Sequence, residues 1–240
     1  MYVRMLRDMR VTASVAGIDE AGRGALAGPV VAGACIIATK LFRRRIPCSG
    51  WSPFSKKCNW IIADSKQLTP KLRDEAYLWI IHHCAYGCGV ASHREVEELG
   101  ILGATERAMQ RAVKQLCEKI KPTCLLVDGR DHFWFDLPHI EIIRGDQSEA
   151  CIAAASIIAK VTRDRLMCEE HRRFPLYGFA QHKGYGTPAH IKNIKAHGSS
   201  VIHRRSFLRN FTNDTGSFDD GGFSQIQRSA PIMKMGRVSS

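Results

Sequence analysis

The stretch Val15-Ala-Gly-Ile-Asp-Glu-Ala-Gly-Arg-Gly24 places two adjacent carboxylates, Asp19 and Glu20, where a short apolar strand is expected to end. In α/β sheets, ligands bind in the crevice beyond the strand ends. Two neighbouring acids repel each other, so a fold seldom sets them at such an edge without a cation that neutralises them. The stretch therefore predicts a sheet edge at which divalent metal ions bind.

The overall charge of the 240-residue chain favours an anionic partner. Lys and Arg number 35 against 23 Asp and Glu, which gives a net charge of +12. This excess points to nucleic acid first and to an acidic membrane surface second, although many soluble proteins are simply basic. No apolar run approaches the roughly 18 to 20 residues of a membrane span, and the first ten residues mix charges too closely for a secretory signal.

The nine cysteines are scattered and contain no C-x-x-C pair. Cys84 and Cys88 stand four residues apart, but no second cysteine or histidine pair at zinc spacing accompanies them. We therefore expect small buried apolar residues in a reducing compartment, and a cytoplasmic protein.

Predicted strands and helices alternate along the chain, which indicates an α/β fold. Strands are expected at Val15–Asp19, Pro29–Thr39, Gly87–Ser92, Thr123–Val127 and Ile140–Ile143, and helices from Thr69 to about Ala85, over 104–120, and from near Gln147 through Ala159. The first two strands are separated by a glycine-dense turn and form a hairpin or lie side by side.

Two further acids share the setting of Asp19 and Glu20. Asp128 follows one predicted strand directly, and Asp146 follows the next. Mg²⁺ and Mn²⁺ prefer oxygen ligands, which several strands can supply together. Two such ions, bound close to each other, can catalyse cleavage of a phosphodiester. Each acid also has a simpler explanation: Asp146 as a helix cap, Asp128 as a turn residue, and the first two as partners of Arg23.

Seven blocks of sequence, in order, resemble ribonuclease HII, the type 2 ribonuclease H of bacteria. They span about residues 14 to 207 and are Gly17-Ile-Asp-Glu-Ala-Gly-Arg-Gly24, Asp64-Ser-Lys66, Val127-Asp-Gly129, Gly145-Asp146, Ala153-Ala-Ala-Ser-Ile-Ile-Ala-Lys-Val-Thr-Arg-Asp164, His182-Lys-Gly-Tyr-Gly-Thr187 and His203-Arg-Arg-Ser-Phe207. The resemblance implies an RNase H-like α/β core, with a central mixed β-sheet flanked by helices, and a small helical C-terminal part.

The same resemblance implies an activity and its partners. Members cleave RNA in RNA–DNA hybrids with Mn²⁺ or Mg²⁺, and nick duplex DNA on the 5′ side of an embedded ribonucleotide, leaving a 3′-hydroxyl and a 5′-phosphate. They mostly act as monomers, and the resemblance identifies no replication partner for this chain. It places the metal-binding catalytic acids at Asp19, Glu20, Asp128 and Asp146.

The resemblance also implies supporting and substrate-binding residues. Asp164 matches a further acid near the site, although it could instead pair with Arg163 or Arg165 within its helix. Gly22, Arg23 and Gly24 match the ribonucleotide-sensing loop, whose backbone groups suit a 2′-hydroxyl. Tyr185 matches the tyrosine that stacks on the deoxyribose 3′ of the ribonucleotide. Phosphate-backbone contacts are expected from Ser65, Lys66, His182, Lys183, Arg204 and Arg205, each of which could also be a solvated charge.

The expected organisation has three parts. A basic lead-in covers 1–13, the catalytic domain covers 14–208, and a flexible tail covers 209–240. Within the domain, the core runs to about 165, the helical part to about 208, and a basic insertion occupies 40–62. Ala25 departs from the proline usual after the Gly-Arg-Gly loop, which would loosen that turn.

Three other functions remain open from the sequence. Ribonuclease HIII has similar acids, but also a separate N-terminal domain and a different glycine loop. A non-catalytic nucleic-acid-binding protein on the same fold would bind without cutting, although all four acids are present. A junction-resolving nuclease on a similar core would cleave all-DNA substrates.

Overall fold

The computed structural model describes residues 14–37 and 68–209. A five-stranded sheet in these residues has the order β3-β2-β1-β4-β5. Its strands are β1 (Val15–Ala21), β2 (Val30–Ile36), β3 (Ala85–Ala91), β4 (Cys124–Asp128) and β5 (His139–Ile142). The predicted lead-in, the basic insertion and the tail from residue 210 lie outside the described residues.

The sheet is mixed, as expected for the fold class. β2 pairs antiparallel with both β1 and β3, so the first two strands are neighbours as predicted. β4 lies parallel to β1 on its other side and carries β5 parallel at the edge. Because Ile18 pairs with Val127, the residues that follow them, Asp19 and Asp128, reach the same end of the sheet.

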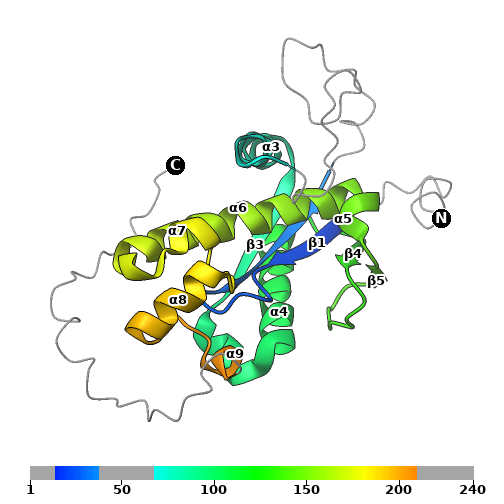
Figure 1. Ribbon diagram of the computed structural model, residues 1–240. Helices are drawn as coiled ribbons and strands as arrows, with labels where there is room; N and C mark the ends of the chain where they lie inside the picture. Colours follow the sequence, from blue (N-terminus) through cyan, green and yellow to red (C-terminus); the bar gives the residue numbers. More distant parts are fainter. Residues whose placement is uncertain (1–13, 38–67, 210–240) are drawn as a thin grey trace.

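Helices cover both faces of the sheet (Figure 1). On one face, α4 (His93–Cys117) buries Ala104, Ala108 and Ala112 against the strands. On the other face lies α6 (Ala150–Arg173), which packs against α3 (Pro70–His83). The interior between them holds small and branched apolar side chains, which allow helix and sheet to approach closely.

Gly17 shows how close this approach is. A Cβ atom on Gly17 would lie 2.2 Å from the carbonyl carbon of Cys151 and 2.2 Å from the backbone nitrogen of Ile152. Backbone atoms cannot move aside as a flexible side chain does, so only glycine fits. The contact fixes the start of α6 against β1, two residues before Asp19.

Two helices differ from their predicted extents. α4 begins at His93 rather than near 104, after a capping box in which Ser92 and Glu95 satisfy each other's backbone N–H groups, and it ends at Cys117. Gly100, with φ of 70°, interrupts it and hides its first turns from apolar periodicity. The helix expected from near Gln147 is two: the short α5 (Gly145–Ser148), and then α6.

The C-terminal part is helical, as the family resemblance implied. It consists of η1 (Pro175–Tyr177), α7 (Phe179–His182), α8 (Pro188–His197) and α9 (Arg205–Leu208). Its small core contains Phe179 and Ile194 together with Leu26 from the glycine loop. Residues 25–28 of the loop after β1 are thus buried, and Leu26 and Ala27 pack against these helices. Within the described residues, no helix has both the length and the apolar character needed to cross a bilayer.

Candidate active site

The structure brings the four predicted acids to one region of the sheet. Asp19 and Glu20 lie within β1, which runs two residues beyond its predicted end. Asp128 is the last residue of β4, and Asp146 lies in α5, directly after β5. The Gly145 N–H donates to Asp128 Oδ1 at 2.7 Å, so the residue before Asp146 is held against Asp128.

Asp19 and Glu20 carry negative charge that the surrounding protein only partly compensates. Burial raises the pKa of Asp19 well above its ordinary value, and the charges of Glu20 and Asp128 raise it further. Burial also raises the pKa of Glu20, and Asp128 and Asp131 add to this while Arg23 opposes it. Buried carboxylates that repel one another in this way are the electrostatic setting in which a divalent cation is favoured.

Protein donors bind these carboxylates in the structure. Asp19 Oδ1 accepts the backbone N–H of Glu20 at 2.7 Å. The Arg23 guanidinium lies between two acids, 3.2 Å from Glu20 Oε1 and 2.8 Å from Asp131 Oδ2. In residues 14–37 and 68–209, no three Asp, Glu, His or Cys side chains are grouped closely enough to hold a metal ion as they stand. The donor set is nevertheless all carboxylate oxygen, which matches Mg²⁺ or Mn²⁺.

The Gly22–Pro29 loop follows the acids and is held by two buried arginines. Arg163 of α6 donates to the carbonyls of Pro29 at 2.9 Å and Ala27 at 3.1 Å. Arg204 donates to the carbonyls of Gly28 and Arg23, both at 3.0 Å. Four carbonyls of one loop are thereby fixed by two guanidinium groups, so the loop has a defined shape before any ligand arrives.

The surrounding structure requires glycine at one position of this loop, Gly22, but not at another, Gly24. Gly22 has φ of 98°, and a Cβ atom there would lie 2.0 Å from Arg163 Nε, so the fold itself requires it. Gly24 is exposed, and a Cβ atom there would meet no protein atom within 4 Å. Packing within the described residues therefore does not explain Gly24. Ala25 donates its N–H to the Gly22 carbonyl at 3.3 Å, a bond that proline cannot make, so the turn is closed rather than loosened.

Tyr185 lies beside the glycine loop. Tyr185 pairs with Ala25 in an isolated β-bridge, and the Leu26 N–H donates to the Gly184 carbonyl at 2.8 Å. The guanidinium carbon of Arg163 lies 5.0 Å from the centre of the tyrosine ring, and Lys160 Nζ lies 5.7 Å from it. The structure thus brings together the two segments expected to sense the ribonucleotide and the DNA that follows it.

Of the predicted phosphate contacts, the structure contradicts the one at Arg204, and the others stay predictions. Arg204 is completely buried and burial lowers its pKa to about 9, so it holds the loop from inside rather than reaching solvent. His182 Nε2 lies 2.7 Å from the Tyr177 carbonyl, an internal hydrogen bond. Lys183 is half-buried and its ammonium donates to the Ala180 carbonyl. Arg205 is exposed, and Ser65 and Lys66 lie outside the described residues.

One face of α6 contacts both Asp19 and the Gly22–Pro29 loop. This role of the face was not predicted from the sequence. The Ser156 side chain hydrogen-bonds Asp19, Lys160 Nζ lies 2.7 Å from Asp164 Oδ1, and Arg163 reaches the glycine loop. Asp164 therefore pairs with a lysine, not with either predicted arginine. Polar residues at intervals of four and three in an Ala- and Ile-rich helix were the signal that this face lines a site.

Comparisons with known proteins agree with this geometry. The family model described as Ribonuclease HII matches residues 16–210. Ribonuclease HII of Chlamydia caviae is 45% identical over 196 residues, covering 80% of this chain and 83% of that protein. The ribonuclease H2 of Pyrococcus horikoshii OT3 superposes with a TM-score of 0.61 at 26% identity, over 84% of this chain and 100% of that one. Bst-RNase HIII in complex with Mn²⁺ gives a TM-score of 0.56 at 17% identity, over 81% and 67%, which shows a shared fold.

Proposed function

Because the chain belongs to the ribonuclease HII family, we propose that it nicks duplex DNA on the 5′ side of an embedded ribonucleotide with the help of two divalent cations. The coarser activity comes with the family: the chain is a ribonuclease H, an endonuclease that cleaves RNA in RNA–DNA hybrids. Family membership also decides against ribonuclease HIII, whose solved structure shares the fold at 17% identity.

One observation carries the proposal: carboxylates from separate strands repel one another at the sheet end beside a preformed glycine loop. Asp19, Glu20, Asp128 and Asp146 would hold Mg²⁺ or Mn²⁺, as a Mn²⁺ complex of a structural neighbour also suggests. When bound, two such ions activate the attacking water and stabilise the leaving 3′ oxygen.

The chain's own residues supply position and charge. Arg23 pairs with Glu20 and Asp131, and its partly exposed guanidinium would also contact a substrate phosphate. The exposed backbone at Gly24 has room for a 2′-hydroxyl, which both donates and accepts. Tyr185 would stack on the deoxyribose that follows, and a replication partner is not part of the proposal.

A labelled DNA duplex with one ribonucleotide tests this function. We expect one nick on the 5′ side of the ribonucleotide in Mg²⁺ or Mn²⁺, with a 3′-hydroxyl and a 5′-phosphate. EDTA should abolish cleavage, and the same duplex without the ribonucleotide should stay intact. Binding without nicking would support a non-catalytic scaffold, and cleavage of all-DNA substrates that contain a junction would support a junction-resolving nuclease.

A further inference from the structure

A chain of hydrogen bonds between buried side chains ends on the backbone of Tyr185. The Ser200 N–H donates to His203 Nδ1 at 2.8 Å, and the Ser200 hydroxyl lies 2.8 Å from the same nitrogen. His203 Nε2 lies 3.0 Å from His190 Nε2, and His190 Nδ1 lies 2.9 Å from the Tyr185 carbonyl. Ser200, His190 and His203 are all buried, so water does not compete for these bonds.

The donors and acceptors in this series of hydrogen bonds determine which nitrogen of each imidazole carries the proton. His203 Nδ1 receives a backbone N–H, so it must be an acceptor and the proton of this ring is on Nε2. That proton is donated to His190 Nε2, which leaves the proton of His190 on Nδ1, facing the Tyr185 carbonyl. The bonds therefore run in one direction, from Ser200 to Tyr185.

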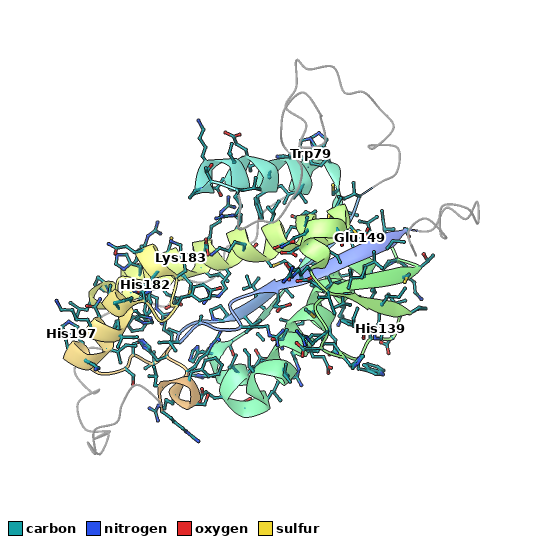
Figure 2. All side chains as sticks on the ribbon, turned by 45° about the vertical axis from the view of Figure 1, so that its right-hand side comes forward. Trp79, His139, Glu149, His182, Lys183 and His197 are labelled. Atoms are coloured by element: carbon teal, nitrogen blue, oxygen red, sulfur yellow. The ribbon has the colours of Figure 1, made fainter. Side chains whose placement is uncertain are left out.

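The imidazole of His182 binds the backbone of Gly184, the residue before Tyr185. His182 stacks on His190, with ring centres 4.2 Å apart and planes inclined by 19°. The Gly184 N–H donates to His182 Nδ1 at 3.2 Å. Lys183 and Gly184 both have positive φ, 53° and 82°, a backbone conformation that is costly at lysine. In Figure 2, His182 and Lys183 lie together at the end of the molecule opposite Glu149.

This series of hydrogen bonds requires the imidazole rings of His190 and His203 to be neutral. Burial lowers the pKa of His190 to about 4, with a further contribution from His182. Burial lowers the pKa of His203 to about 3, helped by His190, and also by His182 and by His93 of α4. Protonation of His190 would place two N–H groups face to face across 3.0 Å, which the neutral rings avoid at the pH of a cell.

We propose that His190 is a positioning residue for Tyr185, and that the Ser200–His203–His190 chain sets the tyrosine for the deoxyribose that follows an embedded ribonucleotide. The proposal rests on the proposed function and deepens it. Any buried imidazole needs hydrogen-bond partners, so the inference rests on which group His190 contacts, the Tyr185 carbonyl. Here the last donor in the chain meets the peptide of the one residue whose ring is expected to read the RNA–DNA junction.

Three substitutions at His190 separate positioning from packing. Asparagine places an amide N–H near the position of Nδ1, glutamine places one near Nε2, and alanine provides neither. On a duplex with one ribonucleotide, we expect His190→Ala and His190→Gln to lower kcat/KM about tenfold or more, the effect of one lost buried hydrogen bond. His190→Asn should stay within about threefold of the parent, and a continuous RNA–DNA hybrid should be cleaved within about threefold by all three.

The controls keep these outcomes distinct. His197→Ala removes an exposed histidine from the same helix and should change neither substrate. If His190→Ala does not fold, the comparison of asparagine with glutamine decides, since both keep an amide. An equal loss on both substrates, or asparagine no better than glutamine, overturns the positioning role. A parent enzyme that cleaves hybrids but not the one-ribonucleotide duplex overturns the proposed function itself.

The pH dependence gives a second readout. The hydrogen bonds from Ser200 to Tyr185 stay intact at every pH at which His190 and His203 are both neutral. In the parent, the ratio of kcat/KM on the one-ribonucleotide duplex to kcat/KM on the RNA–DNA hybrid should therefore be constant from about pH 5.5 to 8. A ratio that follows a titration near pH 6.5, the ordinary pKa of histidine, would contradict the neutral chain and overturn the proposal.

Discussion

Replacing Asp128 with asparagine is expected to lower the cleavage rate at least about 10³-fold in Mg²⁺, equivalent to about 4 kcal/mol of transition-state stabilisation. The substitution removes one charge and almost no volume. The asparagine Oδ1 can still accept the Gly145 N–H that Asp128 accepts at 2.7 Å. Folding should not suffer, since one of the charges that raise the pKa of Asp19 disappears. Single-turnover cleavage of the one-ribonucleotide duplex, with circular dichroism as a check on folding, measures the effect.

Asp136→Asn is the matched control for this variant. Asp136 is an exposed aspartate in the connection between β4 and β5, which begins after Asp128. Its substitution should leave the rate within about twofold, because a surface charge in water acts weakly at a distance. Near-normal cleavage by Asp128→Asn would contradict the assignment of Asp128 as a metal ligand.

Replacing Arg163 with methionine is expected to lower the free energy of unfolding by about 3 to 5 kcal/mol. Methionine keeps most of the length but donates no hydrogen bond. The carbonyls of Pro29, Ala27 and Lys183, which Arg163 holds at 2.9 to 3.1 Å, would lose their donor. Each buried acceptor left unpaired costs about 1 to 3 kcal/mol. The glycine loop should become mobile, and cleavage of the one-ribonucleotide duplex should fall with it.

Arg173→Met in the same helix provides the comparison. Arg173 is exposed and pairs with Glu170 one turn away at 2.9 Å, an arrangement worth less than about 1 kcal/mol. Urea unfolding of both variants gives the free energies. A loss at Arg163 no greater than that at Arg173 would show that the loop does not depend on the buried guanidinium.

Much of the fold could be predicted because its strands are short apolar runs that end in turn residues. The segments at 15–19 and 123–127 stand out in this way, and both form central strands. The start of α4 could not be found from periodicity, since Gly100 breaks the helical path. Ser92 and Glu95 were a usable capping signal there. The order of strands, with β4 beside β1, depends on tertiary packing that no local pattern encodes.

The candidate site was only partly predictable, for a related reason. The acids are visible because each stands at or next to the end of a strand. The roles of Arg163 and Arg204 are not, because arginine is rarely buried and sequence alone assigns it to the surface. Both are fully buried, and both bind backbone carbonyls from the segment 23–29 that are distant in sequence. Such partners appear only when the chain is folded.

Anomalous diffraction from crystals of the Asp146→Asn variant and of the parent, both grown with Mn²⁺ and a one-ribonucleotide duplex, tests most directly whether the acids form one metal site. In the parent, we predict manganese peaks about 2 Å from carboxylate oxygens of Asp19 and Asp128 at the sheet end, with at least one peak lost in the variant. Manganese bound elsewhere, or bound equally in both crystals, would contradict the site.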